Sequence, residues 1–418
     1  MEKLASSCDV SFGCDPEVFL VNKNGDVIGC EWVVPDDGLR ANKYGASSDR
    51  PPIVVRDGVQ AELHIASTAC RATFSNSLSR SIATLEYWAR RDGASISLSQ
   101  AVNVKKSELS KLSDGARIVG CAPSLSIYGD PPPNVDGSAY PGRSAGGHIH
   151  LGYNTPKGAD KLEVAEDIVA MLDVFVGNTS VLLDRDKKAA ERRELYGRAG
   201  EFRLKPYGLE YRTLSNFWLH SPHLVTLILG LCDTAVSLVV GPAMMKERLA
   251  HYLKIWKGYE YEENYYKDEF GGPTPPAWEW VMSNMNLTSV RQAINTSSKE
   301  EAMRNFRSLV HPFFLRYRPS LLPNLEGRSL PHLYYLVDQI EKKGIKKVFG
   351  VERNSNWTYH WSTDNHNRGW GDWCHMAAST VGYQQFMKRE GKGLGLVEEG
   401  GIWKPVGLEK GEGNEVTS

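Results

Sequence analysis

The chain has 418 residues, of which 41% are hydrophobic, and this length favours two or three domains with a large core. Its 49 lysines and arginines nearly cancel its 50 aspartates and glutamates, which argues against nucleic acid or an acidic membrane surface as a partner. The seven cysteines are scattered, and no two form a Cys-x-x-Cys pair. We therefore expect free thiols in a reducing cytoplasm.

No segment predicts a membrane anchor. The residues that follow Met1 form no apolar signal region. The apolar run 224–240 is shorter than the roughly 20 residues that a membrane span needs, and it contains Asp233. We expect this run to be a buried core helix in a cytoplasmic protein.

Turn residues and apolar spacing predict alternating hairpins and helices along the first half of the chain. One hairpin is predicted over 10–31, around Asn22-Lys23-Asn24-Gly25, and a second over 53–65, turning at Asp57-Gly58. Helical spacing predicts a helix over 72–92 that ends at Gly93. The stretch 130–147 is rich in Pro, Gly, Ser and Asn and predicts a loop, and further helices are predicted over 159–183 and 222–255.

The composition changes after about residue 256. A Tyr- and Glu-rich stretch at 258–266 is followed by predicted helices over 286–311 and 330–343 and by a Trp- and His-rich stretch at 357–375. We expect a catalytic core over 1–255, a mainly helical accessory region over 256–388 that completes the same domain or stands beside it, and a flexible tail over 389–418. The element order predicts an α+β fold with an antiparallel or mixed sheet and helices on its outer face.

Four strand-like segments each place two polar side chains two residues apart. Because side chains alternate between the faces of a strand, each pair shares one face. The pairs are Asp15/Glu17, Gln60/Glu62 with His64, His148/His150 and Glu210/Arg212. Together they predict a polar cavity built on a sheet. Carboxylates and imidazoles in such a cavity suit a divalent cation, and arginines suit phosphate.

Each pair also has a simpler explanation. Asp15 and Glu17 flank Pro16, which favours a strand start or edge, and they can form a solvated strand face. Glu62 can lie on the polar face of an amphipathic strand. The glycines before His148 allow close backbone approach and favour a functional role for that strand. Oxygen ligands outnumber imidazoles in the whole set, which favours magnesium or manganese over zinc.

A second group of arginines leads into the last pair. The segment 196–212 contains Arg198 and the acid/arginine pairs Glu201/Arg203 and Glu210/Arg212. Guanidinium groups bind carboxylates and phosphates in two-point geometry. The alternative interpretation of these pairs is a set of cross-strand salt bridges.

In order and spacing, the four segments resemble the glutamine synthetase and glutamate–cysteine ligase superfamily. Asp15-Pro16-Glu17, Gln60-Ala61-Glu62, Gly147-His148-Ile149-His150 and Glu210-Tyr211-Arg212 are similar to its acidic-Pro-Glu, Gln-x-Glu, Gly-x-His-x-His and Glu-x-Arg strands. More closely, the framing Tyr-Gly-x-Ala-Gly-x-Phe-Arg and Gly-x-Glu-Tyr-Arg-Thr-Leu-Ser-Asn resembles phage carboxylate–amine ligases of type 2, which are amidoligase-like proteins. The resemblance covers about residues 10–255.

This resemblance implies a catalytic funnel lined by an antiparallel sheet. By analogy, Asp15, His148 and Glu210 hold the metal on the nucleotide phosphates, and Glu17 and Glu62 hold a metal nearer the carboxylate substrate. His150 lies near the nucleotide, and phosphate or an acceptor carboxylate is bound by Arg198, Arg203 and Arg212. Two features depart from glutamine synthetase: Asp15 replaces a glutamate, and the strand 59–65 offers one clear carboxylate instead of two, which leaves the number of metals open.

The implied activity is an ATP- and Mg²⁺-dependent (or Mn²⁺-dependent) ligase that joins a small-molecule or peptide carboxylate to an amine through an acyl phosphate. One alternative is a metal-dependent hydrolase that uses His148, His150 and carboxylates. Another is an inactive phage binding or structural protein of the same fold, located like the enzyme in the host cytoplasm if a phage encodes it. The substrates and the oligomeric state stay open.

Overall fold

The computed structural model describes residues 10–40, 52–69, 71–117, 124–130, 142–184, 186–220, 222–240, 277–313, 342–343, 396–399 and 402–405. These residues form antiparallel sheets with several helices, so the fold is of the mixed α+β kind that the element order predicted.

The larger sheet has six strands in the spatial order β6-β1-β11-β13-β12-β9, and all neighbouring strands are antiparallel. Its strands are β1 (Ser11–Cys14), β6 (Ile65–Thr68), β9 (Leu125–Ser126), β11 (Ile149–Gly152), β12 (Glu201–Lys205) and β13 (Gly208–Tyr211). This sheet contains His150, Glu201, Arg203 and Glu210, and His148 and Arg212 lie directly beside the ends of β11 and β13.

The second sheet has the order β3-β2-β5-β4, with β7 also paired to β2. Its strands are β2 (Glu17–Val21), β3 (Val27–Ile28), β4 (Val54–Asp57), β5 (Gln60–Leu63) and β7 (Ser95–Ser97). The β2–β3 and β4–β5 pairs are the two predicted hairpins, and both are confirmed.

The four motif segments therefore lie on two sheets, and the single sheet that the sequence suggested is wrong in this respect. The chain leaves the first sheet at Cys14 and enters the second at Glu17. Pro16 lies between them, as its missing N–H group favours, and its carbonyl accepts a hydrogen bond from the backbone of Leu63. The Asp15-Pro16 step thus joins the two sheets where the polar residues gather.

Two short pairs complete the strands. β8 (Ala101–Asn103) pairs with β10 (Gly142–Ser144), which lies within the stretch 130–147 that was expected to be a loop. β14 (Leu396–Glu399) pairs with β15 (Ile402–Pro405), so part of the expected flexible tail 389–418 forms an antiparallel hairpin.

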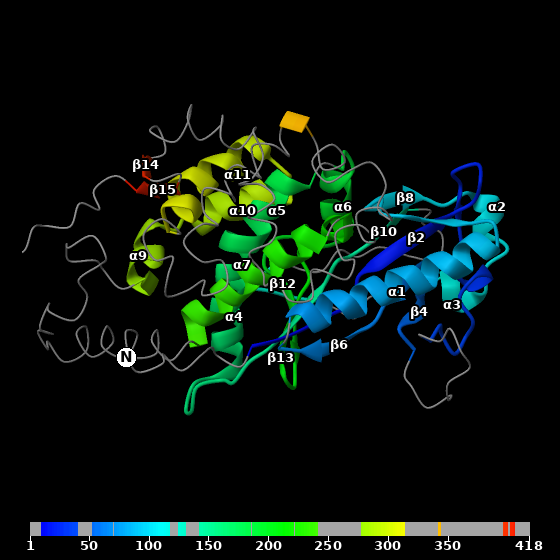
Figure 1. Ribbon diagram of the computed structural model, residues 1–418, viewed down its shortest axis with the longest axis horizontal. Coiled ribbons are helices and arrows are strands. Elements are labelled where there is room, and N and C mark those ends of the chain that lie inside the picture. Colours follow the sequence, from blue (N-terminus) through cyan, green and yellow to red (C-terminus); the bar gives the residue numbers. More distant parts are fainter. Residues whose placement is uncertain are drawn as a thin grey trace, which may run out of the picture.

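Helices lie beside the sheets (Figure 1). The α-helices are α1 (Arg71–Arg91), α2 (Lys106–Leu109), α3 (Asp114–Arg117), α4 (Lys161–Leu172), α5 (Asn178–Leu183), α6 (Ala189–Leu195), α7 (Pro222–Val240), α9 (Ala277–Asn284), α10 (Leu287–Asn295) and α11 (Lys299–Asn305). Shorter turns are the 3-10 helices η1 (Cys30–Trp32) and η3 (Asn216–His220) and the π-helical turns η2 (Asp173–Gly177) and η5 (Phe306–Val310). In Figure 1, α1 crosses the blue strands at one end of the molecule, and α9, α10 and α11 lie at the other end.

Helix α1 confirms the predicted helix over 72–92. Gly93 follows it with a φ of +73°, a left-handed conformation that glycine adopts without steric cost. Helix α1 packs against β6 and β7, with Phe74, Leu78 and Leu85 fully buried.

The apolar centre of the core lies between α4 and α7, and α4 also contacts β12 and β13. Leu227, Ile228 and Leu231 of α7 are fully buried, and burial of each such side chain contributes about 1.5–3 kcal/mol. The run 224–240 is thus a core helix, as predicted. Among the described helices, none combines the length and hydropathy of a membrane span.

The remaining predicted helices and thiols agree with the structure where it describes them. The predicted helix over 159–183 is present as α4, η2 and α5, and that over 286–311 is present as α10, α11 and η5. Cys14, Cys30 and Cys232 are free thiols, as expected. The segments 241–255, 258–266 and 357–375, and nearly all of the predicted helix 330–343, lie outside the described residues. The division of the chain at residues 255 and 388 stays a prediction.

Candidate active site

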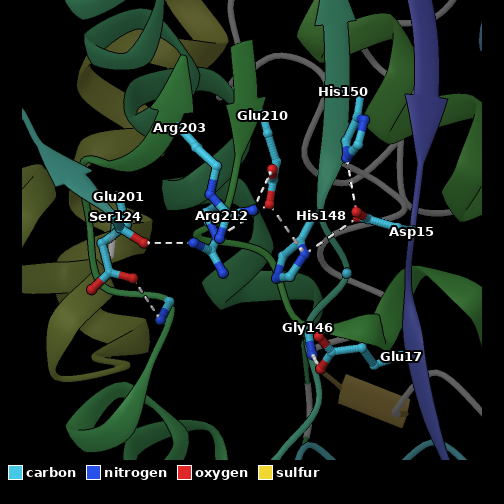
Figure 2. A network of polar contacts seen from close by, with 12 residues as sticks. Asp15, Glu17, Ser124, Gly146, His148, His150, Glu201, Arg203, Glu210 and Arg212 are labelled. Carbon is cyan, nitrogen blue, oxygen red and sulfur yellow. Dashed lines mark hydrogen bonds and ion pairs between the residues drawn. The ribbon is translucent and has the colours of Figure 1, made fainter. Parts of the chain in front are cut away.

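The first cluster of polar groups forms around Asp15, where the chain passes from β1 to β2 (Figure 2). Strand β11 is the neighbour of β1, and it places two imidazoles beside the carboxylate. Nδ1 of His148 lies 3.3 Å from Oδ1 of Asp15, and Nε2 of His150 lies 2.9 Å from Oδ2. The two predicted histidines therefore converge on one acid.

Glu210 completes this cluster from the next strand. It lies opposite His150 in the β11–β13 register, and its Oε1 is 3.6 Å from Nδ1 of His148. One ligand atom from each of Asp15, His148 and Glu210 falls within 4.8 Å of the others. We call these three residues the histidine cluster.

Three cationic side chains surround the carboxylate of Glu210. Nζ of Lys205 lies 2.8 Å and Nη1 of Arg203 3.2 Å from Oε2, and Nε of Arg212 lies 3.2 Å from Oε1. Strand β12 presents Arg203 and Lys205 on the face that meets Glu210, because the two residues are two positions apart. The interpretation of Arg203 and Glu210 as a cross-strand salt bridge is thus also correct.

Lys205 was missed by the sequence reasoning. The signal was present, because Glu201, Arg203 and Lys205 alternate along one strand. Only Glu201 and Arg203 were recognised as a pair, and the lysine at the strand end was left out.

The second cluster comprises three carboxylates on the smaller sheet. Glu17 and Glu62 lie opposite each other in the β2–β5 register, and Asp57 lies opposite Gln60 in the β4–β5 hairpin. Ligand oxygens of Glu17, Asp57 and Glu62 fall within 4.8 Å of one another. We call these residues the carboxylate cluster.

Asp57 provides, from the neighbouring strand β4, the second carboxylate that the strand 59–65 lacks. Sequence reasoning assigned it to the turn Asp57-Gly58, where aspartate is common for local reasons. The hairpin register brings it onto the same face as Glu62, and only the fold of the hairpin reveals this.

Gly146 connects the two clusters. Its backbone N–H donates to Oε2 of Glu17 at 2.8 Å, and its carbonyl accepts from the backbone N–H of Glu17. A Cβ atom at this position would lie only 2.2 Å from Nε2 of His148. Only glycine therefore allows the imidazole of one cluster to approach a backbone that also holds the acid of the other.

The pKa values of the acids differ between the clusters. Burial opposes ionisation of Asp15, but contacts with His148 and His150 outweigh it and hold its pKa well below the usual range. Burial likewise opposes ionisation of Glu210, yet the charges of His148 and Lys205 lower its pKa. In contrast, burial raises the pKa of Glu17 to about 7 against the opposing charge of His148.

Asp57 behaves like Glu17: burial, followed by the charge of Glu62, raises its pKa. Burial and mutual repulsion thus disfavour the ionised forms of Glu17 and Asp57, whereas contacts with cationic groups favour those of Asp15 and Glu210. The third carboxylate, Glu62, contacts the imidazole of His64. A divalent cation between the three carboxylates would remove this repulsion.

The donor atoms fit hard divalent cations. Oδ1 of Asp15 is buried and has no hydrogen-bond partner among the described residues, so its approach to His148 is a charge contact and its lone pairs stay available for a cation. The two clusters together offer five carboxylates and one imidazole. This oxygen-rich set suits magnesium or manganese better than zinc.

The remaining predicted residues differ in their surroundings. His150 receives a second contact from Tyr207, whose hydroxyl lies 2.7 Å from Nδ1. Arg212 is buried, and it donates to the hydroxyl of Ser124 at 3.0 Å. Arg198 instead donates to the carbonyls of Arg193 and Glu194 at the end of α6, so its observed contacts are those of a helix cap and not of either cluster.

The buried side chain of Arg192 holds the loop that precedes β11 in place. The guanidinium of Arg192 in α6 donates to the carbonyls of Ala145, Thr213 and Leu214 at 2.8–3.1 Å. Three carbonyl oxygens compensate the desolvation of this buried cation and join the start of the His148 strand to the end of β13.

Comparison with known proteins gives one informative match. No curated protein matches the chain. A family model described as phage phiEco32-like COOH.NH2 ligase type 2 matches residues 135–296. The matched stretch includes His148, His150, Arg203, Glu210 and Arg212, but not the acids of β2 and β5. This match supports the resemblance to phage carboxylate–amine ligases of type 2 that the motif framing indicated.

Proposed function

We propose that this protein is an ATP- and Mg²⁺-dependent ligase that forms an amide or peptide bond between a carboxylate and an amine. The single observation that carries the proposal is the presence of two clusters whose spacing suits a metal ion, one of which contains Glu210, a carboxylate that three cationic side chains contact. The family name, which is that of a carboxylate–amine ligase, agrees with this chemistry.

The two clusters divide the binding of the reactants between them. The histidine cluster would hold the Mg²⁺ ion on the nucleotide phosphates, with His150 near the nucleotide. The carboxylate cluster would hold a second ion nearer the substrate carboxylate. When bound, the ions neutralise charge on the phosphoryl oxygens and on the attacking carboxylate. Antiparallel strands carry both clusters, which agrees with a funnel open to ATP at one end and to the acceptor at the other.

The cations around Glu210 have a direct role in the first step. The substrate carboxylate oxygen attacks the γ-phosphorus of ATP, the bond to the β-phosphate oxygen breaks, and ADP leaves with its electron pair. Arg203, Lys205 and Arg212 lie within reach of the phosphates if they exchange Glu210 for phosphoryl oxygens. Positioned cations of this kind provide the largest share of the rate enhancement in phosphoryl transfer.

The second step needs no nucleophilic side chain. The amine nitrogen attacks the acyl phosphate, the carbon–oxygen bond to phosphate breaks, and the nitrogen loses one proton. Phosphate is a far better leaving group than oxide, so activation by ATP makes the amide bond accessible at neutral pH. The acyl phosphate therefore accounts for the ATP requirement of the proposed ligase.

Two alternatives fit the arrangement less well. A metal hydrolase would use His148, His150 and carboxylates to activate water, but it has no need for three cations around one metal-ligand carboxylate. An inactive binding protein would not need the buried Glu17 and the half-buried Asp57, whose pKa values are raised by burial, because removing a carboxylate from water destabilises a fold. These features favour the ligase.

The test is ADP release, measured over pairs of carboxylates and amines and followed by mass spectrometry of the products. We expect ADP release that requires both substrates and Mg²⁺, and a loss of at least about 100-fold in Glu17→Gln and Glu210→Gln. Glu166→Gln, an exposed position on α4, is the matched control and should keep full activity. Metal-dependent cleavage without ATP would favour the hydrolase. Unchanged nucleotide binding by the two site variants in calorimetry would favour the binding protein.

A further inference from the structure

A tyrosine outside both clusters contacts the buried histidine of the first one. Tyr196 follows directly after α6, and its hydroxyl oxygen lies 2.8 Å from Nε2 of His148. The imidazole of His148 is only 3% exposed, so water cannot easily replace this partner. The hydroxyl of Tyr196 is therefore the hydrogen-bond partner of Nε2 of His148.

The opposite nitrogen of the same ring faces the acids. Nδ1 of His148 is 3.3 Å from Oδ1 of Asp15 and 3.6 Å from Oε1 of Glu210. In a neutral imidazole one nitrogen carries the proton and the other offers a lone pair. A cation can bind between Asp15, His148 and Glu210 only if the lone pair lies on Nδ1 and the proton on Nε2.

We propose that Tyr196 is a positioning residue, whose hydroxyl oxygen accepts the Nε2–H of His148 and so leaves the Nδ1 lone pair directed at the cation position. The inference rests on the proposed function, because it assumes that the histidine cluster holds a metal ion. Metal-bound histidines commonly donate their second N–H to a protein oxygen, which fixes the ring orientation and the tautomer.

The surroundings hold the phenol of Tyr196 in place. The guanidinium carbon of Arg212 lies 4.8 Å from the centre of its ring, and that of Arg192 lies 5.5 Å away. Arg192 is itself fixed by three backbone carbonyls, and Arg212 contacts Glu210. Tyr196 is thus packed by the same side chains that support the cluster, and its hydroxyl cannot turn away without disturbing them.

A second tyrosine provides an instructive contrast. Tyr207 contacts Nδ1 of His150 at 2.7 Å, and Nε2 of that ring faces Asp15. Each of the two histidines thus contacts a tyrosine through one ring nitrogen and Asp15 through the other. The nitrogen that faces Asp15 is Nδ1 in His148 and Nε2 in His150. Tyr207 is 46% exposed, however, so water can replace its hydroxyl at His150. The Tyr196 contact is the better protected of the two, because His148 is buried.

The test compares Tyr196→Phe with Tyr128→Phe, which also loses a hydroxyl bonded to a buried group, here Asp173 at 3.0 Å. Binding of Mn²⁺ is measured by electron paramagnetic resonance in a Glu62→Gln background, which weakens the carboxylate cluster. We expect Tyr196→Phe to weaken Mn²⁺ binding about 10–100-fold and Tyr128→Phe to change it less than about twofold. Equal affinities in the two variants would overturn the inference.

A second readout follows the tautomer directly and needs no metal. Nitrogen-15 histidine spectra, recorded at a pH where the ring is neutral, should show the Nε2–H form of His148 in the parent protein and a mixed or reversed form in Tyr196→Phe. An unchanged tautomer would contradict the inference whatever the Mn²⁺ result. If the parent protein binds no Mn²⁺ yet the tautomer changes as expected, the proposed metal site fails and the role of Tyr196 in positioning the ring holds.

Discussion

Gly146→Ala is the substitution that tests most directly how the two clusters are held together. A Cβ at this position would lie 2.2 Å from Nε2, 2.8 Å from Cε1 and 2.9 Å from Cδ2 of His148. Ordinary contacts begin at 3.4 Å, so the ring or the backbone must move by about 1.2 Å. Because His148 is buried and bonded to Tyr196, the ring has no free direction in which to move.

The cost can be worked out from these contacts. Overpacking of a buried position destabilises a protein by about 1–3 kcal/mol, and loss of the Tyr196 contact adds about 1 kcal/mol. We therefore expect Gly146→Ala to lower the free energy of unfolding by about 2–4 kcal/mol. The same displacement moves Nδ1 of His148 away from Asp15 and Glu210, so Mn²⁺ affinity at the histidine cluster should fall at least about tenfold.

Urea unfolding and Mn²⁺ titration measure the two effects separately. Gly115→Ala is the matched control, because a Cβ there meets no atom within 4 Å and the residue is helical. It should change the stability by less than about 0.5 kcal/mol and leave Mn²⁺ binding unchanged. A Gly146→Ala protein with parental stability and Mn²⁺ affinity would refute the close approach of Gly146 and His148.

Substitutions of Lys205, Glu62 and Asp173 each test one further side chain. Lys205→Met should raise the KM for ATP about tenfold in the ADP-release assay, because the lysine would exchange its contact with Glu210 for one with phosphate. An unchanged KM would exclude it from nucleotide binding. Glu62→Gln should reduce the number of bound Mn²⁺ ions from two to one, and retention of both would contradict the carboxylate cluster. Burial raises the pKa of Asp173 to about 6, above the value of about 3.8 for an unfolded chain, so the folded state binds more protons between these pH values. The free energy of unfolding should therefore fall by about 3 kcal/mol through Asp173 as the pH rises from 4 to 6, and Asp173→Asn should remove this pH dependence. Urea unfolding that gives the same difference in stability between variant and parent at pH 4.5 and at pH 7 would contradict this prediction.

The sequence predicted those site features that depend on local spacing. The period of two along a strand brought Glu210 and Arg212, or His148 and His150, to one face, and the glycines before His148 indicated close approach. Hairpins and α1 followed from turn residues and helical spacing. These features could be predicted because neighbouring residues determine them.

Features that depend on pairing between distant segments could not be predicted in this way. Asp57 joins the carboxylate cluster only through the β4–β5 register, and Lys205 meets Glu210 only through the β12–β13 register. The division of the motif strands between two sheets at Pro16 likewise depends on tertiary pairing. Arg198 contacts helix carbonyls and neither cluster, so its role in binding stays a prediction.

Oxygen transfer is the measurement that tests the central claim most directly. Any carboxylate found to support ADP release is labelled with oxygen-18 on its carboxyl group, and the products are analysed by mass spectrometry. Because the proposed acyl phosphate breaks between carbon and oxygen, we expect one labelled oxygen in the released phosphate and unlabelled ADP. Unlabelled phosphate, or label in AMP, would contradict activation of the carboxylate by γ-phosphoryl transfer at this site.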